Sequence, residues 1–528
     1  PGADGEVVLD LAPSLAAGLR GGLGYLETFP YACTEQTVSA FLPNAVTYRL
    51  YKQLGVDDNG LKVSLEQNLA AGLQRLYAMQ GLDGGWGWWA NDPSQPYLTA
   101  YVVQGLGEAV KAGYGVDQAT LTRGLDYLHG VLDQGRDQEQ KVPVSSQLNT
   151  RAYILFVLGE LGQPDRGRTV ALFEQREQLD HYGRAYLLMA FKSLGDDTRA
   201  AAIAGDLGAA AIMRPTDAHW EETRPDYATM GSDTRTTALA LQALVRTDPK
   251  SALVPNAVRY LMGLRERDHW RTTQETAVTL MALAEYVAQS GELDADYSYR
   301  VALDDGTLRE GSVGAGNLGD PVSVLVRLAD LAQGTNAALS IQRQAVGGQS
   351  GKGRLYYTLR MRVYQDAAVV QALDQGVGVE RVYGLVDTDT LSPTGELTTQ
   401  ATLGEVVQVR LTLTVPEDMP YFMVEDMLPA GLEALDTSLK TTSALADDPG
   451  LGDTGVWPAW WYFGRTEVRD NRVALFATDL PRGTYTYTYL ARATTPGAFQ
   501  TLPATAMRTY APEVFGRSAG SLFTVTAP

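Results

Sequence analysis

Two residues with complementary chemistry lie three positions apart near the start of this chain. Cys33 carries the only thiol among 528 residues, and Gln36 carries a side-chain amide. Residues three apart on a helix share a face, with Cβ atoms about 5–6 Å apart, so the Cys33 sulfur can reach the amide carbon of Gln36. Attack with loss of ammonia would form an internal thioester. Such a bond stores an acyl group that an amine or a hydroxyl can later take.

The position of Cys33 favours this chemistry. Pro30 prevents a helix from running in from upstream, and apolar residues such as Val38 and Phe41 follow at helical spacing. We therefore expect a helix that starts near Cys33 and holds it in the first turn. Unpaired backbone N–H groups and the positive end of the helix dipole would stabilise a thiolate there. The alternative is an inert buried thiol.

Glu35 lies between the two reactive residues. Its carboxylate can be interpreted as a local base or as a negative charge that favours the N-terminal end of the helix. The expected position in the first turn favours the second interpretation.

A long helical region must position these residues. From Ala12 to about Ser290, apolar residues recur every three or four positions, which predicts helices throughout. Five almost wholly apolar helices are expected to open at related sequences, and the helix after Cys33 is a sixth: Thr99–Val102, Arg151–Ile154, Arg184–Leu187, Thr237–Ala240 and Thr276–Thr279. The intervening segments, such as 61–80, 119–134 and 251–267, are amphipathic. Alternating inner and outer helices predict an α/α toroid of about six pairs.

Aromatic residues come shortly before three of the inner helices, at Trp86, Trp220 and Trp270. One interpretation is that they plug one end of the toroid. The other is that aromatic residues near Cys33 shield a thioester, which survives only where water is excluded. The candidates for this shield are Phe29, Tyr31, Trp86, Trp88, Trp89 and Tyr97.

Strand patterns flank the helical region. Residues 6–11 are strand-like, and apolar residues alternate at 322–328 and 355–363. These strands would build one β-domain into which the toroid is inserted. After Gly376 a last all-β domain begins, as the alternating residues of 407–415 and 485–489 indicate.

Two connections are predicted in this last domain. Residues 425–431 read as a turn, and residues 481–483 read as the connection of a β-hairpin.

The composition and length of the chain limit the classes of protein to which it can belong. Hydrophobic residues make up 45% and charged residues 20%, as in globular proteins, and the length suggests about three domains. A net charge of −19 argues against nucleic acid or an anionic membrane as partner. One cysteine excludes an intrachain disulfide and fits an extracytoplasmic location. No apolar run has the length of a membrane span, the start is not a signal peptide, and we expect a piece of a longer protein.

Other chemistry finds little support. The four histidines are far apart and none has a second ligand at metal spacing, so we expect no metal and no cofactor. Toroids also occur in terpene cyclases and zinc prenyltransferases. The first would need an Asp-rich motif among the helices, whereas the nearest candidate, Asp387 to Asp389, falls in the β region. The second would need its cysteine as a ligand, and here Cys33 is already in the thioester pattern.

Residues 30–36, Pro-Tyr-Ala-Cys-Thr-Glu-Gln, resemble the Pro-Tyr-Gly-Cys-x-Glu-Gln thioester motif of the α2-macroglobulin and complement family, with Ala32 where the family usually has Gly. The segments 98–102 and 273–276 add support. Segments 428–431, 495–499 and 510–514 resemble the C-terminal sandwich of bacterial members. Animal members are rich in disulfides, so the single cysteine favours the bacterial branch.

The resemblance implies a domain order. Residues 1–11 would be the first strand of a CUB-like β-domain, and residues 12–292 the α/α-toroid thioester domain. Residues 293–372 would complete the CUB-like domain, and residues 373–528 would form a C-terminal macroglobulin-like β-sandwich.

The resemblance also implies a function. The protein would be a broad-spectrum endopeptidase inhibitor: a protease cuts a bait region upstream of this chain, and one of its lysine amines attacks the Cys33–Gln36 thioester. This is a single turnover and not enzyme catalysis. Upstream macroglobulin domains would be further partners, the location would be the periplasm or cell surface, and a membrane would be met only through a lipid anchor outside this chain. A covalent surface tag or adhesin, and a scaffold without a thioester, stay open as alternatives.

Overall fold

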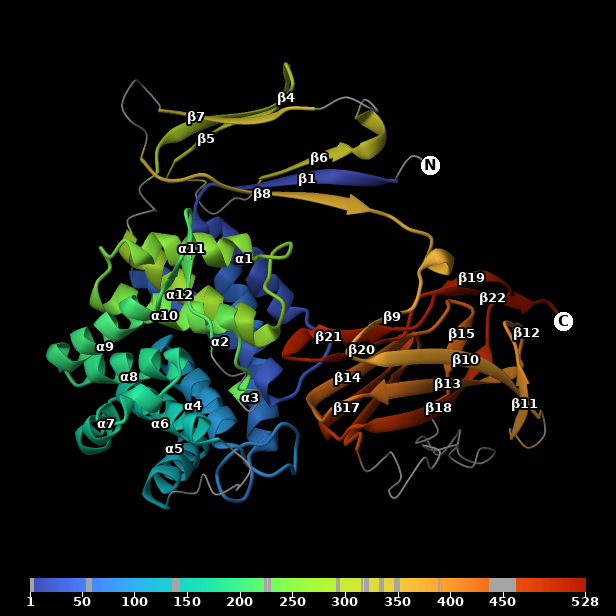
Figure 1. The fold of residues 1–528 in the computed structure, drawn as a ribbon, viewed down its shortest axis with the longest axis horizontal. Coiled ribbons are helices and arrows are strands. Elements are labelled where there is room, and N and C mark those ends of the chain that lie inside the picture. Colours follow the sequence, from blue (N-terminus) through green and yellow to red (C-terminus); the bar gives the residue numbers. More distant parts are fainter. Residues whose placement is uncertain are drawn as a thin grey trace. The chain divides into compact units, whose positions relative to one another are not determined.

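The computed structural model describes the chain except for residues 1–3, 54–58, 135–142, 223–225, 227–228, 291–294, 315–316, 318–321, 332–336, 346–351, 388–389, 391 and 436–461. The described residues form two compact units, Asp4–Arg362 and Val363–Pro528. Figure 1 shows a helical body and a β-domain in the first unit and strands in the second. The predicted boundary at 292/293 lies outside the described residues, and the other sequence-based domain limits stay predictions.

The helical body is an α/α toroid, as the sequence predicted (Figure 1). Its inner helices touch in the order α2, α4, α6, α8, α10, α12, and α12 returns to α2, which closes the ring. The inner helices are α2 (Thr34–Gln53), α4 (Pro96–Lys111), α6 (Val144–Glu160), α8 (His181–Ser193), α10 (Asp233–Thr247) and α12 (Thr273–Ser290). The outer helices are α1 (Leu15–Glu27), α3 (Asn59–Met79), α5 (Gln118–Gln134), α7 (Arg166–Phe173), α9 (Asp197–Ala210) and α11 (Leu253–Gly263).

Burial separates the two layers. Inner helix α12 is buried at every position from Thr273 to Val287. Outer helix α11 buries a single stripe, which consists of Val254, Ala257, Val258 and Leu261. Helices that are apolar on all sides therefore fill the centre, and amphipathic helices cover them.

Two sheets form the β-domain of the first unit. Strand β1 (Gly5–Ala12) lies between β6 (Val322–Arg327) and β8 (Tyr356–Val363). The second sheet has the order β5-β4-β7, with β4 (Tyr297–Leu303), β5 (Gly306–Val313) and β7 (Leu339–Ala345). The strand ahead of the toroid thus shares a sheet with strands that follow it, as expected for an inserted helical domain.

The second unit is a β-sandwich with three sheets, in the orders β11-β10-β13-β18-β15, β16-β17-β14-β20-β21-β9 and β12-β22-β19. The alternating residues predicted on one face, Val407, Val409, Leu411 and Leu413, are fully buried on β13. The strands are β9 (Leu373–Gln375), β10 (Gly378–Val386), β11 (Pro393–Leu397), β12 (Gln400–Thr402), β13 (Val406–Val415), β14 (Met419–Met427), β15 (Leu432–Ala434), β16 (Arg465–Arg469), β17 (Arg472–Leu480), β18 (Gly483–Ala493), β19 (Gly497–Thr501), β20 (Thr505–Arg508), β21 (Ala511–Arg517) and β22 (Ser521–Thr526). A short hairpin of β2 (Ile212–Met213) and β3 (Ala218–His219) belongs to the toroid.

The two connections predicted in this unit both differ from the structure. The turn expected at 425–431 begins only after Met427, because β14 continues through Glu425 and Asp426. Asp426 is buried, accepting a contact from Arg381 at 2.5 Å and a hydrogen bond from the Tyr489 hydroxyl at 2.8 Å. Partners on other strands therefore hold this acidic residue inside a strand. The β-hairpin predicted at 481–483 is also wrong, because this segment links β17 to β18 and these two strands lie in different sheets.

Candidate thioester site

The start of α2 brings Cys33 and Gln36 together. The Cys33 N–H donates to Oε1 of Gln36 at 3.1 Å, and the Gln36 N–H donates to Sγ of Cys33 at 3.5 Å. This reciprocal contact is a capping box in which a cysteine stands where serine or threonine is usual. The first helical bond runs from the Thr37 N–H to the Cys33 carbonyl at 2.9 Å. Cys33 is therefore the N-cap residue, one position earlier than the expected first turn.

The pair is buried and its geometry suits acyl chemistry. Cys33 is 4% exposed and Gln36 is 7% exposed. The sulfur accepts a hydrogen bond from the backbone N–H of the residue whose side-chain amide it would attack. The Cys33 N–H already donates to the oxygen of that amide, where negative charge would develop in the transition state. One capping motif thus supplies the nucleophile, the electrophile and a donor for the oxyanion.

The Trp88 segment packs against this helix start. The Thr34 N–H donates to the Trp88 carbonyl at 3.0 Å, and the Thr34 hydroxyl donates to the Gly87 carbonyl at 2.6 Å. Trp88 is buried. The loop ahead of α4 therefore covers the residue next to Cys33.

Glu35 points into the toroid. It is fully buried, and its carboxylate accepts hydrogen bonds from Ser39 at 2.5 Å and from Thr273 at 2.7 Å. Because the Ser39 proton goes to Glu35, the Tyr101 hydroxyl donates to Ser39, at 2.9 Å. Burial, followed by the charge of Glu35, raises the pKa of Tyr101 well above its usual value, so this donor keeps its proton. Glu35 thus joins the starts of α2, α4 and α12.

Phe29 and Tyr31 belong to a row of aromatic rings. Their ring centroids lie 6.0 Å apart, Tyr25 lies 5.6 Å from Phe29, and Tyr25 stacks on His269 at 3.7 Å. Tyr31 is buried and Phe29 is half-buried. The segment that leads to Cys33 is therefore fixed against α1 and the loop ahead of α12.

Trp86 follows a pattern that recurs around the toroid. Its indole N–H donates to a carbonyl of α3 at 2.8 Å, and its backbone N–H donates to Thr99 of α4 at 2.9 Å. Trp220 and Trp270 make the same two contacts with their own outer and inner helices. Because Trp86 shares these contacts with the other two tryptophans, they favour the interpretation that all three plug one end of the toroid over a special role of Trp86 beside Cys33.

Trp89 and Tyr97 have other surroundings. Trp89 is half-buried, and its N–H donates to Asp92 at 3.0 Å. The Tyr97 hydroxyl accepts a hydrogen bond from Arg235 at 2.9 Å, and the Tyr97 ring lies 4.8 Å from Tyr153. Tyr97 thus belongs to an aromatic cluster within the inner helices.

Arg235 is the residue that sequence reasoning missed in this cluster. It is fully buried, and its guanidinium lies 4.4 Å from the ring centroid of Tyr182. The Tyr182 hydroxyl in turn donates to Asp226 at 2.5 Å. The available signal was an arginine in the first turn of an inner helix, ahead of its mostly apolar middle.

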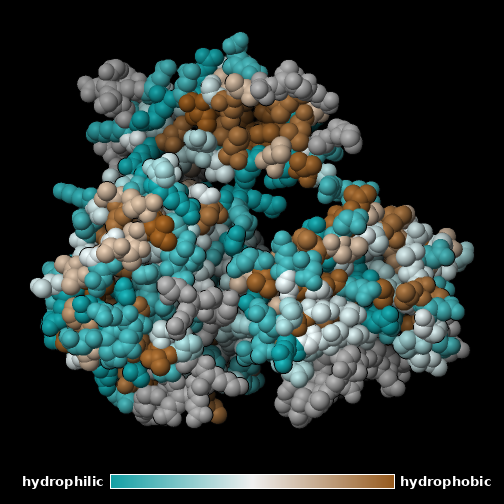
Figure 2. All heavy atoms as spheres, in the orientation of Figure 1, coloured by the Kyte–Doolittle hydropathy of each residue, from teal (hydrophilic) through white to brown (hydrophobic). Residues whose placement is uncertain are grey.

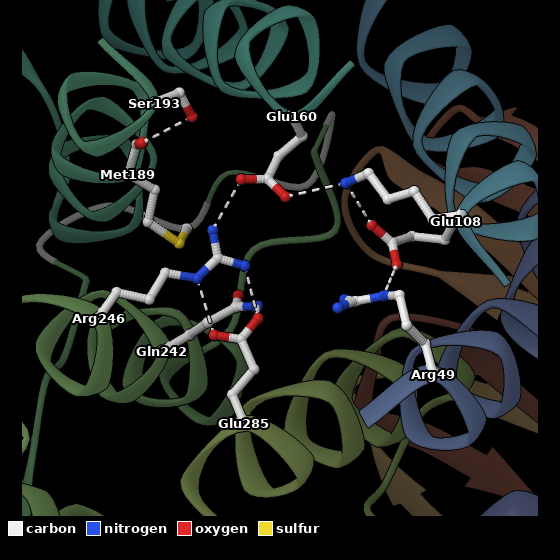
Figure 3. A network of polar contacts seen from close by, with 9 residues as sticks. Arg49, Glu108, Glu160, Met189, Ser193, Gln242, Arg246 and Glu285 are labelled. Atoms are coloured by element: carbon white, nitrogen blue, oxygen red, sulfur yellow. Dashed lines mark hydrogen bonds and ion pairs between the residues drawn. The ribbon is translucent and has the colours of Figure 1, made fainter. Parts of the chain in front are cut away.

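The other end of the inner helices carries an ionic network, shown in Figure 3. Glu108 contacts Arg49 at 3.0 Å and Lys111 at 2.8 Å, and Lys111 also contacts Glu160 at 3.1 Å. Arg246 contacts Glu160 at 3.0 Å and Glu285 at 2.5 Å.

The charges of this network balance, with three cations and three carboxylates. Burial alone would raise the pKa of Glu160, but the charges of Arg246 and Lys111 hold that pKa below its usual value. Glu160 therefore stays ionised in contact with Arg246 and Lys111.

Within the described residues, no group of three or more His, Cys, Asp and Glu side chains is arranged to hold a metal ion. No helix in the described part of the chain is long and apolar enough to cross a membrane.

Residues 7–286, more than half of the chain, match the family model described as the A-macroglobulin TED domain, and residues 376–513 match the bacterial alpha-2-macroglobulin MG10 domain. The chain belongs to the α-macroglobulin family. Within it, the similar curated proteins include an alpha-2-macroglobulin homolog of Nostoc sp., 27% identical over 86% of this chain and 23% of its own length. The alpha-2-macroglobulin of Escherichia coli is 26% identical over 94% of this chain and 28% of its own length. The chain thus spans about a quarter of these relatives.

Solved structures show the same fold. Native E. coli alpha-2-macroglobulin from domain MG7 to the C-terminus matches with a TM-score of 0.73 at 23% identity, over 99% of this chain and 78% of that one. Salmonella alpha-2-macroglobulin reacted with methylamine matches with a TM-score of 0.71 at 23% identity, over 100% of this chain and 32% of that one.

Proposed function

We propose that this chain is the thioester-bearing part of a broad-spectrum endopeptidase inhibitor, which traps proteases and links to them covalently through Cys33 and Gln36. The observation that carries the proposal is the capping box, with both reactive side chains buried in reciprocal contact. A cysteine inert in the core has no need of an amide held against it in this way.

In the first step, the Cys33 sulfur attacks the side-chain carbonyl carbon of Gln36. The carbon–nitrogen bond breaks, and ammonia leaves with the thiol proton. The positive end of α2 favours the thiolate, and the Cys33 N–H stabilises the developing oxyanion. The product is a thioester between the two residues.

In the second step, a lysine amine of the captured protease attacks the same carbon. The carbon–sulfur bond breaks, Cys33 leaves as the thiolate and takes up a proton, and an amide links Gln36 to the lysine. An amide is more stable than a thioester, so the reaction runs in one direction and once. The protein therefore acts as an inhibitor and not as a catalyst.

Burial of the Cys33–Gln36 pair determines when the proposed reaction can occur. Tyr31 and the Trp88 loop would keep the lysine side chains of a protease from Cys33, so a rearrangement would precede the reaction with a protease. Cleavage of a bait region in the upstream part of the full protein would trigger it. The β-domain that carries the toroid would be the CUB-like domain, and the location the periplasm or cell surface. The Salmonella relative that was reacted with methylamine supports amine attack at such a site.

Intact mass and thiol titration test the proposal on the full-length protein. The expected mass is one ammonia below the sequence value, and Cys33 should react with thiol reagents only after methylamine is added. A Gln36→Ala variant should keep the full mass expected for its sequence and an unmodified thiol. A wild-type protein with the sequence mass and a thiol that is titratable after unfolding in the absence of amine would overturn the thioester.

A second measurement separates trapping from tagging. Full-length protein is incubated with a protease, and cross-linked peptides are identified by mass spectrometry. A bond between Gln36 and a protease lysine that requires prior cleavage of the inhibitor supports the trap. A bond between Gln36 and a protease lysine that forms without cleavage of the inhibitor supports the covalent surface tag instead.

A further inference from the structure

A pocket opens where the β-domain of the first unit meets the helical body. Its volume is about 230 Å³, and it is lined by residues of β1, β6 and β8 on one side and by the segment after α11 on the other. Figure 2 shows hydrophilic side chains on this side of the β-domain, whereas hydrophobic side chains gather between its two sheets. Pockets for drug-sized molecules measure about 300–1,000 Å³, so this one fits a smaller ligand.

The charged lining of this pocket is mostly arginine. Arg265 and Arg267 come from the segment after α11, and Arg360 comes from β8. Two carboxylates, those of Asp10 and Asp268, also line the pocket. The lining therefore carries a net positive charge, in a chain whose net charge is −19.

On the side of the β-domain, Asp10 is already bonded. The Ser323 hydroxyl donates to one of its oxygens, and the Arg360 guanidinium donates to the other. A guanidinium has five N–H donors, and this contact uses only Nη2 of Arg360. Its Nη1 has no hydrogen-bond partner among the described residues. Arg360 can therefore bind Asp10 and still donate to an anion in the pocket.

On the side of the toroid, a tight turn presents Arg267. The Glu266 N–H donates to the His269 carbonyl at 2.8 Å, and the His269 N–H donates to the Glu266 carbonyl at 3.2 Å. Arg267 lies in this turn with a φ of 59°, in the left-handed region. Its side chain is exposed and forms no ion pair with a described residue, unlike Arg271, which contacts Glu266 at 3.8 Å. The turn thus holds an uncompensated positive charge at the pocket.

The two sides of the pocket bring like charges close together. Burial lowers the pKa of Arg265, the charges of Asp268 and Asp10 oppose this effect, and the charge of Arg360 adds to it. Arg265 and Arg360 therefore repel each other across the junction between the toroid and the β-domain. An anion bound beside both guanidinium groups would offset this repulsion.

We propose that this pocket binds a small oxyanion, such as phosphate, which bridges the turn at 266–269 and strand β8. Arg267 and Arg360 would donate to it from opposite sides, because planar guanidinium groups match the oxygens of phosphates and carboxylates. Arg265 would add a third positive charge, and the three charges together disfavour a metal cation. The bound anion would strengthen the attachment of the toroid to the β-domain that carries it.

Isothermal titration calorimetry on the full-length protein tests this inference. Phosphate is titrated at an ionic strength that sodium chloride keeps constant, so that charge screening does not change during the experiment. The wild type should bind one phosphate per molecule. Arg267→Gln should weaken the affinity about tenfold, because it removes a charged donor from the pocket. The matched control is Arg271→Gln, which removes the same charge from an exposed side chain outside the pocket lining and should leave the affinity unchanged.

Thermal unfolding gives a second measurement of the same site. A ligand that binds only the folded state raises the melting temperature. Phosphate should therefore raise the melting temperature of the wild type and of Arg271→Gln, and it should raise that of Arg267→Gln much less.

A variant on the opposite side of the pocket completes the test. Arg360→Lys keeps a positive charge beside Asp10 but loses the planar guanidinium, so it should also bind phosphate more weakly than the wild type. The absence of phosphate binding by the wild type would overturn the inference. Equal affinities of Arg267→Gln and Arg271→Gln for phosphate would overturn it as well.

Discussion

The two ends of the inner helices differ in how they are held together. At the start of α2, α4 and α12, Glu35 is bonded by hydroxyl groups, and Cys33 and Gln36 cap a helix with each other. At the other end, three cations and three carboxylates are bonded into one network (Figure 3). A few hydroxyl and helix-capping hydrogen bonds hold the helices together at the first end, whereas salt bridges hold them together at the second.

Helix direction explains part of this difference. Each inner helix is followed by an outer one that returns the chain, so the inner helices run the same way and their N-terminal ends gather at one end of the ring. Partial positive charge there favours Glu35 and a Cys33 thiolate, and partial negative charge at the opposite end favours Arg49, Lys111 and Arg246. The proposed thioester and the ionic network thus lie at opposite ends of the same helices.

The largest expected effect is at the reactive end. Cys33→Ala should abolish the covalent incorporation of a fluorescent amine into the full-length protein, because the acyl group can no longer be stored. Labelling per folded molecule should be unchanged in Glu108→Gln, at the opposite end. Labelling is measured by gel fluorescence. Wild-type incorporation in the Cys33 variant would show that another residue reacts.

The next largest effect is at the ionic end. Arg246 is 20% exposed and contacts both Glu160 and Glu285, so Arg246→Met leaves both carboxylates without this partner. The free energy of unfolding in urea should fall by about 3 kcal/mol. Lys192→Met removes an exposed contact to Asp197 and should cost less than about 1 kcal/mol. If Arg246→Met and Lys192→Met lose similar free energy of unfolding, the network contributes no more to stability than an exposed ion pair.

A smaller difference is expected when one side-chain hydroxyl group is removed at either end of the inner helices. Thr273→Val removes one donor from the buried Glu35 and should lower the free energy of unfolding by about 2 kcal/mol. It should also speed the reaction with methylamine, because α2 is less firmly joined to α12. Thr247→Val, at the far end of α10, removes a bond within its own helix and should change stability by less than about 0.5 kcal/mol. If Thr273→Val reacts with methylamine at the wild-type rate, the hydrogen bond from Thr273 to Glu35 does not influence the reactive site.

The smallest expected effect is one of pH at the N-terminal ends of α8 and α10. Burial raises the pKa of Glu222 from 4.5 to about 6. The folded protein therefore keeps this proton at a pH where the unfolded chain has lost it, so stability falls as pH rises through this range. The fall should be roughly 1–2 kcal/mol and should vanish in Glu222→Gln. Urea unfolding at pH 4.5 and pH 6.5 measures this fall in the free energy of unfolding. An equal fall in the wild type and in Glu222→Gln would show that Glu222 does not hold the proton.

Local patterns in the sequence were sufficient to predict the six inner helices, three outer helices and several strands. Spacing of three and four placed the inner helices and the outer helices α3, α5 and α11, although α6 begins at Val144, ahead of the expected opening at Arg151. Alternation placed β6, β8 and β13. The Cys33–Gln36 pair was also predictable, because a capping box is a contact within one turn.

Contacts between distant segments were not predictable. Arg49, Glu108 and Glu285 each look like an ordinary charge near the end of a helix, and they come together only when the ring closes. The Tyr97–Arg235 bond likewise joins α4 to α10. Asp426 was assigned to a turn by its composition, whereas its partner Arg381 lies on another strand. Such pairings depend on tertiary structure, and one sequence carries no pattern for them.

Strand β1 gives the molecule a mechanical property. It joins directly onto the toroid and has a hydrogen-bonded neighbour on each side, β6 and β8. A pull on the toroid along this strand would load both rows of backbone bonds in shear, so that they share the force instead of opening one at a time. The connection should then act as a tether that outlasts large displacements of the helical body.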